Sequence, residues 1–135
     1  MTPEFLTAVI DTLLPGDEAL PSATRAGLDP AVYARAHRTV FDAIAGQAGS
    51  NELFARADES ARNAILKAVE RALPDAFRAL LVAVLSDYYE APPVLAALGW
   101  RIDPPQPSGH AMPRLDGPTT ERLERVGRRA KLWRA

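Results

Sequence analysis

The side chains best suited to catalysis in this sequence are two histidines and five serines, and none lies in a recognisable catalytic motif. His37 and His110 are 73 positions apart, so they lack the close spacing with which two histidines on one helix bind a metal ion. No serine lies in the Gly-x-Ser-x-Gly turn that presents a nucleophile. Cysteine is absent, which removes thiol nucleophiles, thiolate metal sites and disulfides. We therefore expect no catalytic and no metal-binding residue in this chain.

Two carboxylates come closest to an acid–base pair. Asp87 and Glu90 flank a pair of tyrosines at the expected end of a helix, a position where such carboxylates are usually solvated. A small enzyme remains an alternative if Asp87, Glu90 and His110 converge in one pocket. The eight glycines stand singly and match neither the dinucleotide-binding pattern nor the P-loop. We expect no cofactor-binding residue.

The size and charge of the chain limit the remaining functions. Its 135 residues are 47% hydrophobic, enough for one hydrophobic core. The formal net charge of −1 gives no reason to expect general nucleic-acid binding. No apolar stretch is long enough to span a bilayer, and the first residues lack the basic region of a signal peptide. We expect a cytoplasmic protein, or a periplasmic one only if a signal-bearing partner exports it.

Apolar residues recur with the period of an α-helix in four segments. The segments span residues 5–14, 30–46, 60–73 and 77–88. Thr2 and Asp29, each followed by proline, are the expected N-caps of the first two, and Asp58 or Ser60 caps the third. The apolar stripe of the second comprises Val32, Tyr33, Ala36, Val40, Phe41 and Ile44. The fourth has the most regular pattern, formed by Phe77, Leu80, Leu81, Val84, Leu85 and Tyr88. No segment alternates as a strand does, so the sequence predicts an all-α fold, a compact bundle of four to five helices.

The character of the chain changes after residue 90, where seven of the twelve prolines lie between Glu90 and Thr119. A short helix over residues 94–98 is expected to end at Gly99, and residues 100–117 should be extended, because proline removes backbone donors and disfavours helix before it. Thr119 or Thr120 is the expected cap of a last, basic helix. We expect one domain of three parts: a bundle over 1–90, a short helix and proline-rich strap over 91–117, and a basic helix over 118–135.

The strap and the residues before it have the composition of a contact surface. Aromatic residues and prolines offer large, stiff area at low conformational cost. Tyr88 lies on the apolar stripe and is expected in the core, whereas Tyr89, about 100° further round the helix, is expected to contact a partner. The candidate partner-binding residues are Tyr89, Pro92, Leu98, Trp100, Pro104, Pro105, Pro107, His110, Arg125, Arg129 and Trp133.

The basic C-terminal segment permits a second interpretation. Residues 118–135 carry six basic residues against Glu121 and Glu124, a net +4 that leaves −5 for the rest of the chain. Such a helix docks most simply on its own domain or on an acidic protein. The alternative is a stand-alone helical protein that binds nucleic acid or an anionic membrane through this helix.

Three stretches of the sequence resemble a known family. They are LTAVIDTLLPGD with PSATRAGL, then LLVAVLSDYYEAPPVLAALGW, then PPQPSGH. Together they resemble the gluconate 2-dehydrogenase subunit 3 family, over roughly residues 5–115. The most specific part runs from the paired tyrosines through Leu-Gly-Trp to His110.

The resemblance implies a non-catalytic small subunit. Such subunits accompany, stabilise or chaperone a large flavoprotein of the glucose-methanol-choline (GMC) oxidoreductase type, a sugar or alcohol dehydrogenase, sometimes with a cytochrome subunit. It implies a heterodimer in which FAD belongs to the partner, with no nucleic acid bound and no membrane insertion. The twin-arginine signal that many members carry is missing before Phe5. The strap is therefore expected to lie on the flavoprotein, whose groups would satisfy its backbone.

Overall fold

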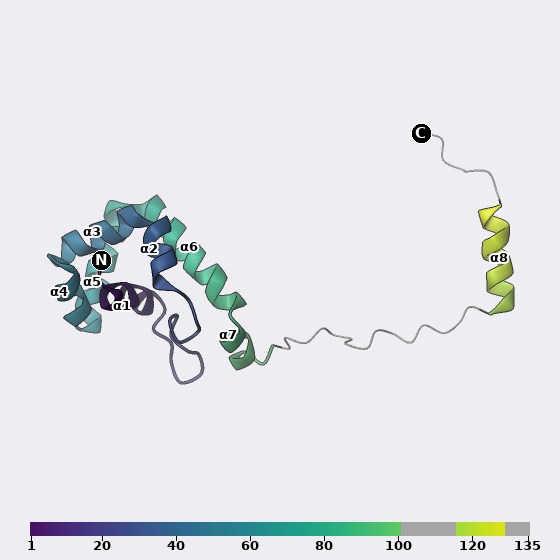
Figure 1. The fold of residues 1–135 in the computed structure, drawn as a ribbon, viewed down its shortest axis with the longest axis horizontal. Coiled ribbons are helices and arrows are strands. Elements are labelled where there is room, and N and C mark those ends of the chain that lie inside the picture. The colour runs from purple at the N-terminus through teal and green to yellow at the C-terminus, as the bar shows by residue number, and fades with distance from the viewer. Residues whose placement is uncertain (101–115, 129–135) are drawn as a thin grey trace. The chain divides into compact units, whose positions relative to one another are not determined.

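A computed structural model describes residues 1–100 and 116–128, and all regular structure in them is helical (Figure 1), which confirms the predicted all-α fold. The helices in these residues are α1 Pro3–Leu13, α2 Pro30–Ala36, α3 Arg38–Ala48, α4 Asn51–Arg56, α5 Glu59–Ala72, α6 Pro74–Glu90, α7 Pro92–Ala97 and α8 Gly117–Gly127. The chain divides into one unit over Met1–Ile102, which contains α1 to α7, and a second over Asp103–Ala135, which contains α8. Each unit is described by itself.

Three helices of the bundle, α1, α2 and α5, begin at N-caps that the sequence predicted. The hydroxyl of Thr2 accepts a hydrogen bond from the backbone N–H of Phe5 at 3.3 Å, and the carboxylate of Asp29 accepts one from Ala31 at 2.9 Å. α5 is capped by Asp58, not by Ser60, through a 2.8 Å bond from the N–H of Ala61. Each cap satisfies a backbone donor that the helix itself leaves unpaired.

The second expected helix is divided at His37, whose backbone (φ −119°, ψ 38°) leaves the helical region between α2 and α3. The break changes which side chains face inward. Tyr33, Val40, Phe41 and Ile44 are buried as expected, whereas Val32 and Ala36 are exposed, so their predicted place in the core was wrong.

The short helix α4 was not predicted. The hydroxyl of Ser50 accepts a bond from the N–H of Leu53 at 3.1 Å and starts this helix directly after Gly49, whose positive φ of 86° ends α3. Phe54 of α4 is fully buried. The helix therefore completes the core although its sequence shows little periodicity.

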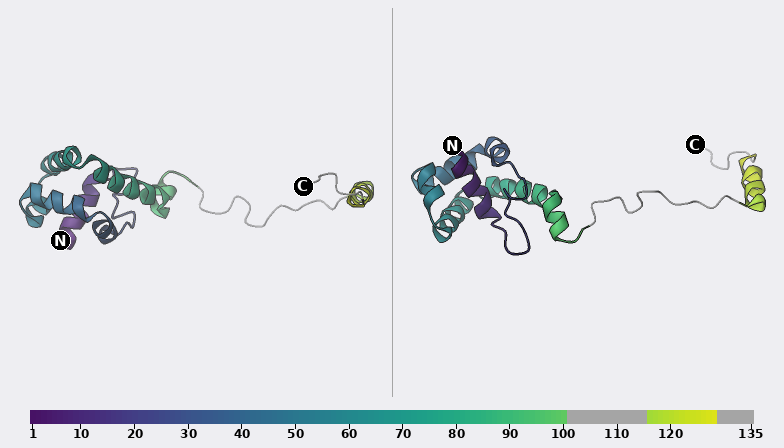
Figure 2. Two further views of the ribbon diagram at one scale, coloured as in Figure 1. Left: turned by 90° about the horizontal axis from the view of Figure 1, so that it is seen from above. Right: turned by 60° about the horizontal axis from the view of Figure 1, so that its bottom comes forward.

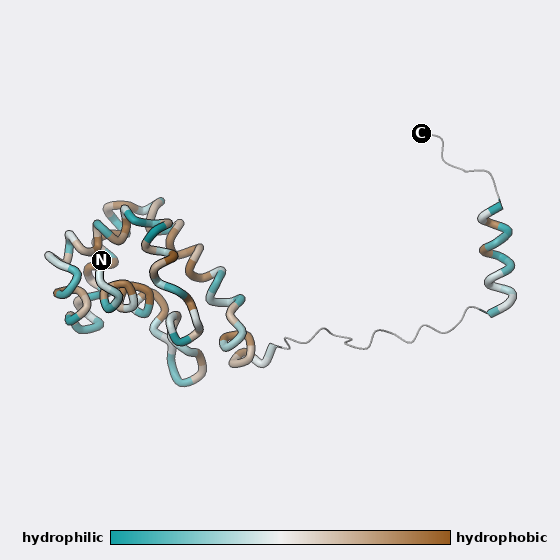
Figure 3. The backbone as a smooth tube through the Cα atoms, viewed as in Figure 1, coloured by the Kyte–Doolittle hydropathy of each residue, from teal (hydrophilic) through white to brown (hydrophobic). Residues whose placement is uncertain are grey.

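The core of the bundle is formed around Phe5 of α1. Its ring meets Phe41 of α3 and Phe54 of α4 edge to face, with centroids 6.3 Å and 5.6 Å apart. Phe77, Leu80, Val84 and Tyr88 bury the inner face of α6, which packs against α2, α3, α5 and α7. Long hydrophobic stretches in α1 and α6 mark these contributions in Figure 3. Burial of large aromatic and aliphatic side chains drives the folding of this unit.

The second unit contains α8, whose N-cap is Asp116. The carboxylate of Asp116 accepts a 2.8 Å bond from the N–H of Thr119, so the expected cap at Thr119 or Thr120 was wrong. A hydrogen bond from the Thr119 side chain, and then the one from its backbone N–H, lower the pKa of Asp116. Within residues 116–128 no side chain is buried, and Leu123 and Val126 are exposed. No helix in the described residues is long and apolar enough to cross a membrane.

Candidate partner-binding corner

The loop between α1 and α2, residues 14–29, is held in one shape by carboxylates. Both oxygens of Asp11 bind Thr24, one at 2.9 Å from the backbone N–H and the other at 2.6 Å from the hydroxyl. One oxygen of Asp17 accepts the N–H groups of Leu20 and Ala19, each at 2.8 Å, and these bonds lower the pKa of Asp17. The Asp-x-x-x-Pro-Gly-Asp motif of the sequence therefore has a structural role, because it orders an exposed loop.

Gly16 is the tightest point of this loop. Its φ of +73° is a conformation that residues with a side chain rarely adopt. A Cβ at this position would lie 2.4 Å from the backbone nitrogen of Ser22 and 2.7 Å from the carbonyl oxygen of Leu20. The loop folds back on itself here, and only glycine fits.

Two tyrosines connect the α1–α2 region to α6. The hydroxyl of Tyr88 donates a 2.7 Å hydrogen bond to the carbonyl oxygen of Pro21, and the hydroxyl of Tyr33 on α2 donates one to Asp87 at 2.5 Å. Burial raises the pKa of Tyr33, and the bond to Asp87 and the charges of Asp87 and Asp29 raise it further. Burial is also the main cause of the raised pKa of Tyr88. Tyr88 lies in the core, as predicted.

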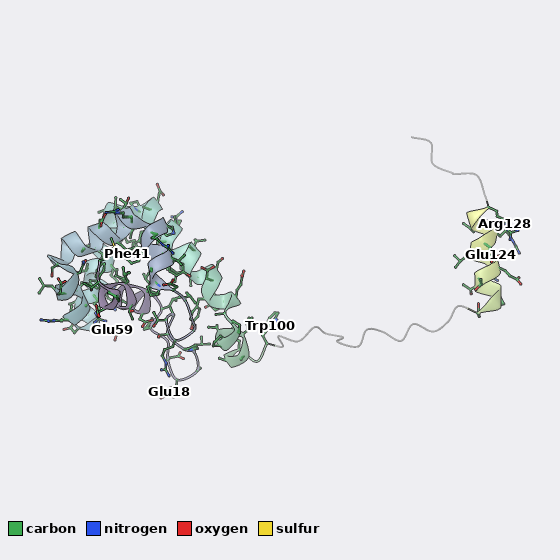
Figure 4. The ribbon with its side chains drawn as sticks, in the orientation of Figure 1. Glu18, Phe41, Glu59, Trp100, Glu124 and Arg128 are labelled. Atoms are coloured by element: carbon green, nitrogen blue, oxygen red, sulfur yellow. The ribbon has the colours of Figure 1, made fainter. Side chains whose placement is uncertain are left out.

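α7 follows α6 at the same end of the bundle. It is stopped by Leu98 and by Gly99, whose φ is +70°, as predicted for a left-handed cap. The N–H of Trp100 then bonds to the carbonyl oxygen of Leu95 at 2.8 Å, which fixes the backbone of Trp100 against α7. The loop and α7 lie at one end of the bundle in all three ribbon views (Figures 1 and 2), and Figure 4 labels Glu18 at the loop and Trp100 beside α7. We call residues 14–29, the last turn of α6, α7 and residues 98–100 the docking corner.

Large apolar side chains are exposed at the docking corner. Tyr89 is 52% exposed, Leu98 52% and Trp100 69%. The ring of Tyr89 rests edge to face on Tyr88, with centroids 5.4 Å apart, so it is supported from below while its outer side faces solvent. Grouped exposed apolar side chains at one end of a well-packed unit are typical of a binding surface.

A hollow of about 320 Å³ lies between the loop, α2, α6 and α7. Its apolar wall includes Leu28, Val32, Ala91 and Pro92. Its polar wall includes Asp29 and Asp87, and Tyr33 also lines it. The hollow is open to solvent and therefore accessible to a side chain of another molecule.

The candidate partner-binding residues fall into three groups. Tyr89, Pro92, Leu98 and Trp100 are exposed and belong to the docking corner. Arg125 is exposed on α8, in the other unit. The remaining candidates, Pro104, Pro105, Pro107, His110, Arg129 and Trp133, lie outside the described residues, as does most of the expected strap.

Two of the three residues of the acid–base alternative lie in the described part of the chain. Asp87 is engaged by the hydroxyl of Tyr33, Glu90 is exposed, and His110 lies outside the described residues. In the part of the chain that the structure describes, no three His, Asp or Glu side chains are grouped to hold a metal ion.

The sequence alone predicted neither the hollow nor the contribution of the α1–α2 loop to the docking corner. Pro21 and Tyr88 are 67 positions apart, and no periodic pattern reports a contact over that distance. The motif around Asp11 and Asp17 was a signal that the loop is ordered, but it does not say which surface the loop builds.

Comparisons of the chain with protein-family models, with curated proteins and with solved structures found no match.

Proposed function

We propose that this chain is a non-catalytic small subunit that binds and stabilises a large FAD-dependent dehydrogenase of the GMC type. The proposal starts from the resemblance to the gluconate 2-dehydrogenase subunit 3 family. The observation that carries it furthest is the exposure of Tyr89, Leu98 and Trp100 at one end of the bundle. These residues lie within the most specific part of the resemblance.

The docking corner has the properties of a preorganised interface. The backbone of Trp100 is fixed by its bond to Leu95, the ring of Tyr89 is supported by Tyr88, and the α1–α2 loop is held by Asp11 and Asp17. A surface that is already ordered loses less conformational entropy when it binds. Aromatic side chains that become buried when a complex forms commonly dominate the energy of the interface.

The chemistry of the complex belongs to the partner in this proposal. FAD and the catalytic residues lie in the large subunit, and a cytochrome subunit can accept its electrons. This chain contributes by covering an apolar surface of the flavoprotein and favouring its folded, FAD-loaded form, because a ligand that binds only the folded state stabilises that state.

Two exposed leucines allow a matched test of the surface. Leu98 in the docking corner is 52% exposed and Leu53 on α4 is 60% exposed. Because both are on the surface, Leu98→Asp and Leu53→Asp should leave the bundle folded. We expect Leu98→Asp, and equally Trp100→Ala, to lower co-purification of a GMC-type flavoprotein from the same organism, and Leu53→Asp to leave it unchanged. Equal co-purification with all three variants would contradict the proposed surface.

α8 supports a second candidate function. Its exposed Leu123 and Val126 lie on a helix that also presents Arg122, Arg125 and Arg128. A helix of this composition can lie on an anionic membrane or along nucleic-acid phosphates. Salt-sensitive retention on heparin or on phosphatidylserine vesicles that disappears when residues 118–135 are removed would favour this function.

A further inference from the structure

The hollow of the docking corner combines an apolar wall with carboxylates. Val32, which is 46% exposed, and Pro92 belong to the apolar wall, and Asp29 and Asp87 line the same hollow. Among the residues that the structure describes, no lysine or arginine lines it. The hollow therefore offers apolar contact and negative charge at one place.

Both carboxylates are oriented by hydrogen bonds, and within residues 1–100 and 116–128 the second oxygen of each accepts none. Asp87 accepts the hydroxyl of Tyr33 at its Oδ2 atom, and Asp29 accepts the N–H of Ala31 at its Oδ1 atom. The ion pairs within residues 1–100 and 116–128 are Arg38 with Asp42 and Arg128 with Glu124, so neither carboxylate of the hollow has a cationic partner there. Both carboxylates line the hollow together with Tyr33.

The residues around the hollow also carry a net negative charge. Besides Asp29 and Asp87, the docking corner contains Asp17, Glu18, Arg25 and Glu90, so five carboxylates accompany one guanidinium group. A cation that approaches this end of the bundle is attracted, and the apolar wall can cover an aliphatic stem.

We propose that the hollow receives an arginine or lysine side chain of the large flavoprotein subunit. The aliphatic stem packs on Val32 and Pro92, and the cationic end binds the second oxygens of Asp87 and Asp29. Charge-assisted bonds of this kind fix the orientation of two proteins as well as holding them. The inference rests on the proposed function, because it names the chemistry that the partner brings to the same corner. It adds a polar anchor beside the apolar one at Leu98 and Trp100.

The test uses the intact chain and a GMC-type flavoprotein from the same organism, with the dissociation constant measured at several salt concentrations. Asp87→Asn removes the charge and keeps an oxygen that can accept the bond from Tyr33, so the fold is preserved. Asp75→Asn at the start of α6 is the matched control. We expect Asp87→Asn to weaken the complex on the order of tenfold and to reduce its salt dependence, as loss of an interfacial charge does. Asp75→Asn should leave both unchanged.

A second pair of variants tests the apolar wall. Val32→Lys places an amine at the hollow, where it competes with the incoming cation, and Val82→Lys places one on the 58% exposed Val82 of α6 as its control. We expect only Val32→Lys to weaken binding. If Leu98→Asp abolishes the complex while Asp87→Asn and Val32→Lys bind like the wild type, this inference is overturned and the proposed function stands. If the wild-type chain does not bind the flavoprotein, the proposed function fails and the inference fails with it.

Discussion

The hydroxyl of Tyr88 on α6 lies 2.7 Å from the carbonyl oxygen of Pro21 in the α1–α2 loop, and its bond joins two sequence motifs that are 67 positions apart. One motif orders the loop through Asp11 and Asp17, and the other continues through Tyr89 to the exposed Trp100. The ring of Tyr88 is buried, so the bond is shielded from water. The docking corner depends on this connection.

Replacing Tyr88 by phenylalanine should loosen the loop without emptying the core. The ring remains, but the carbonyl oxygen of Pro21 loses its partner, which costs about 1 kcal/mol of the free energy of unfolding. Urea denaturation measures the loss, and amide hydrogen exchange in residues 14–29 should rise. Tyr89→Phe is the control, because the Tyr89 hydroxyl makes no hydrogen bond within the part of the chain that the structure describes. Equal stability of Tyr88→Phe and the wild type would show that the bond contributes nothing.

Gly16 should tolerate no side chain. Gly16→Ala combines a positive φ with a Cβ 2.4 Å from a backbone atom, so we expect destabilisation of about 2 kcal/mol or more. Gly46→Ala is the control, since Gly46 lies inside α3 with nothing within 4 Å of an added Cβ. That change should stabilise the protein by up to about 1 kcal/mol. Thermal unfolding measures the stability of both variants. If Gly16→Ala were as stable as the wild type, the conformation of the loop described above would be contradicted.

Alkaline pH should unfold the bundle through its two hydrogen-bonded tyrosines. Tyr33 and Tyr88 have raised pKa values in the folded protein, whereas an unfolded tyrosine ionises near pH 10. Above about pH 10 the unfolded chain loses protons that the folded chain keeps, so the stability present below that pH falls as the pH rises toward the folded pKa values. Urea midpoints between about pH 8 and pH 11 measure this fall. Tyr33→Phe should reduce it, and an identical profile for that variant would argue against a role for Tyr33.

Removing residues 118–135 should weaken the flavoprotein complex most at low ionic strength. This segment carries a net charge of +4, and salt screens exposed charges over about 10 Å at 0.1 M. The dissociation constants of the full and shortened chains should therefore converge as salt is added. If they agree already at low salt, the C-terminal segment makes no electrostatic contribution to the complex.

The helical elements were largely predictable from local sequence. Caps such as Thr2 and Asp58 act within three residues, and the apolar stripe of α6 correctly identified Phe77, Leu80, Val84 and Tyr88 as buried. The division at His37 was not predictable, because continuous periodicity on both sides suggested one helix. α4 was missed because six residues are too few to establish a period.

The candidate site was predictable only in part. The position of Tyr89 on the helix and the Leu-Gly-Trp pattern correctly indicated exposed apolar residues. Asp29, Tyr33 and Asp87 line the hollow together. The hydrogen bond between Tyr33 and Asp87 arises from tertiary packing, which local sequence does not report. Asp87 is exposed, as expected of a solvated carboxylate, and its bond from the hydroxyl of Tyr33 was not predicted.

In the proposed function, this chain binds a flavin-dependent large subunit and stabilises its folded form. A co-expression experiment produces a GMC-type flavoprotein from the same organism with and without this chain, and follows FAD-loaded, soluble flavoprotein and co-elution on a sizing column. The account predicts that the two chains co-elute and that the yield of FAD-loaded flavoprotein falls when this chain is omitted. A flavoprotein that folds, binds FAD and elutes alone in both cases would contradict it.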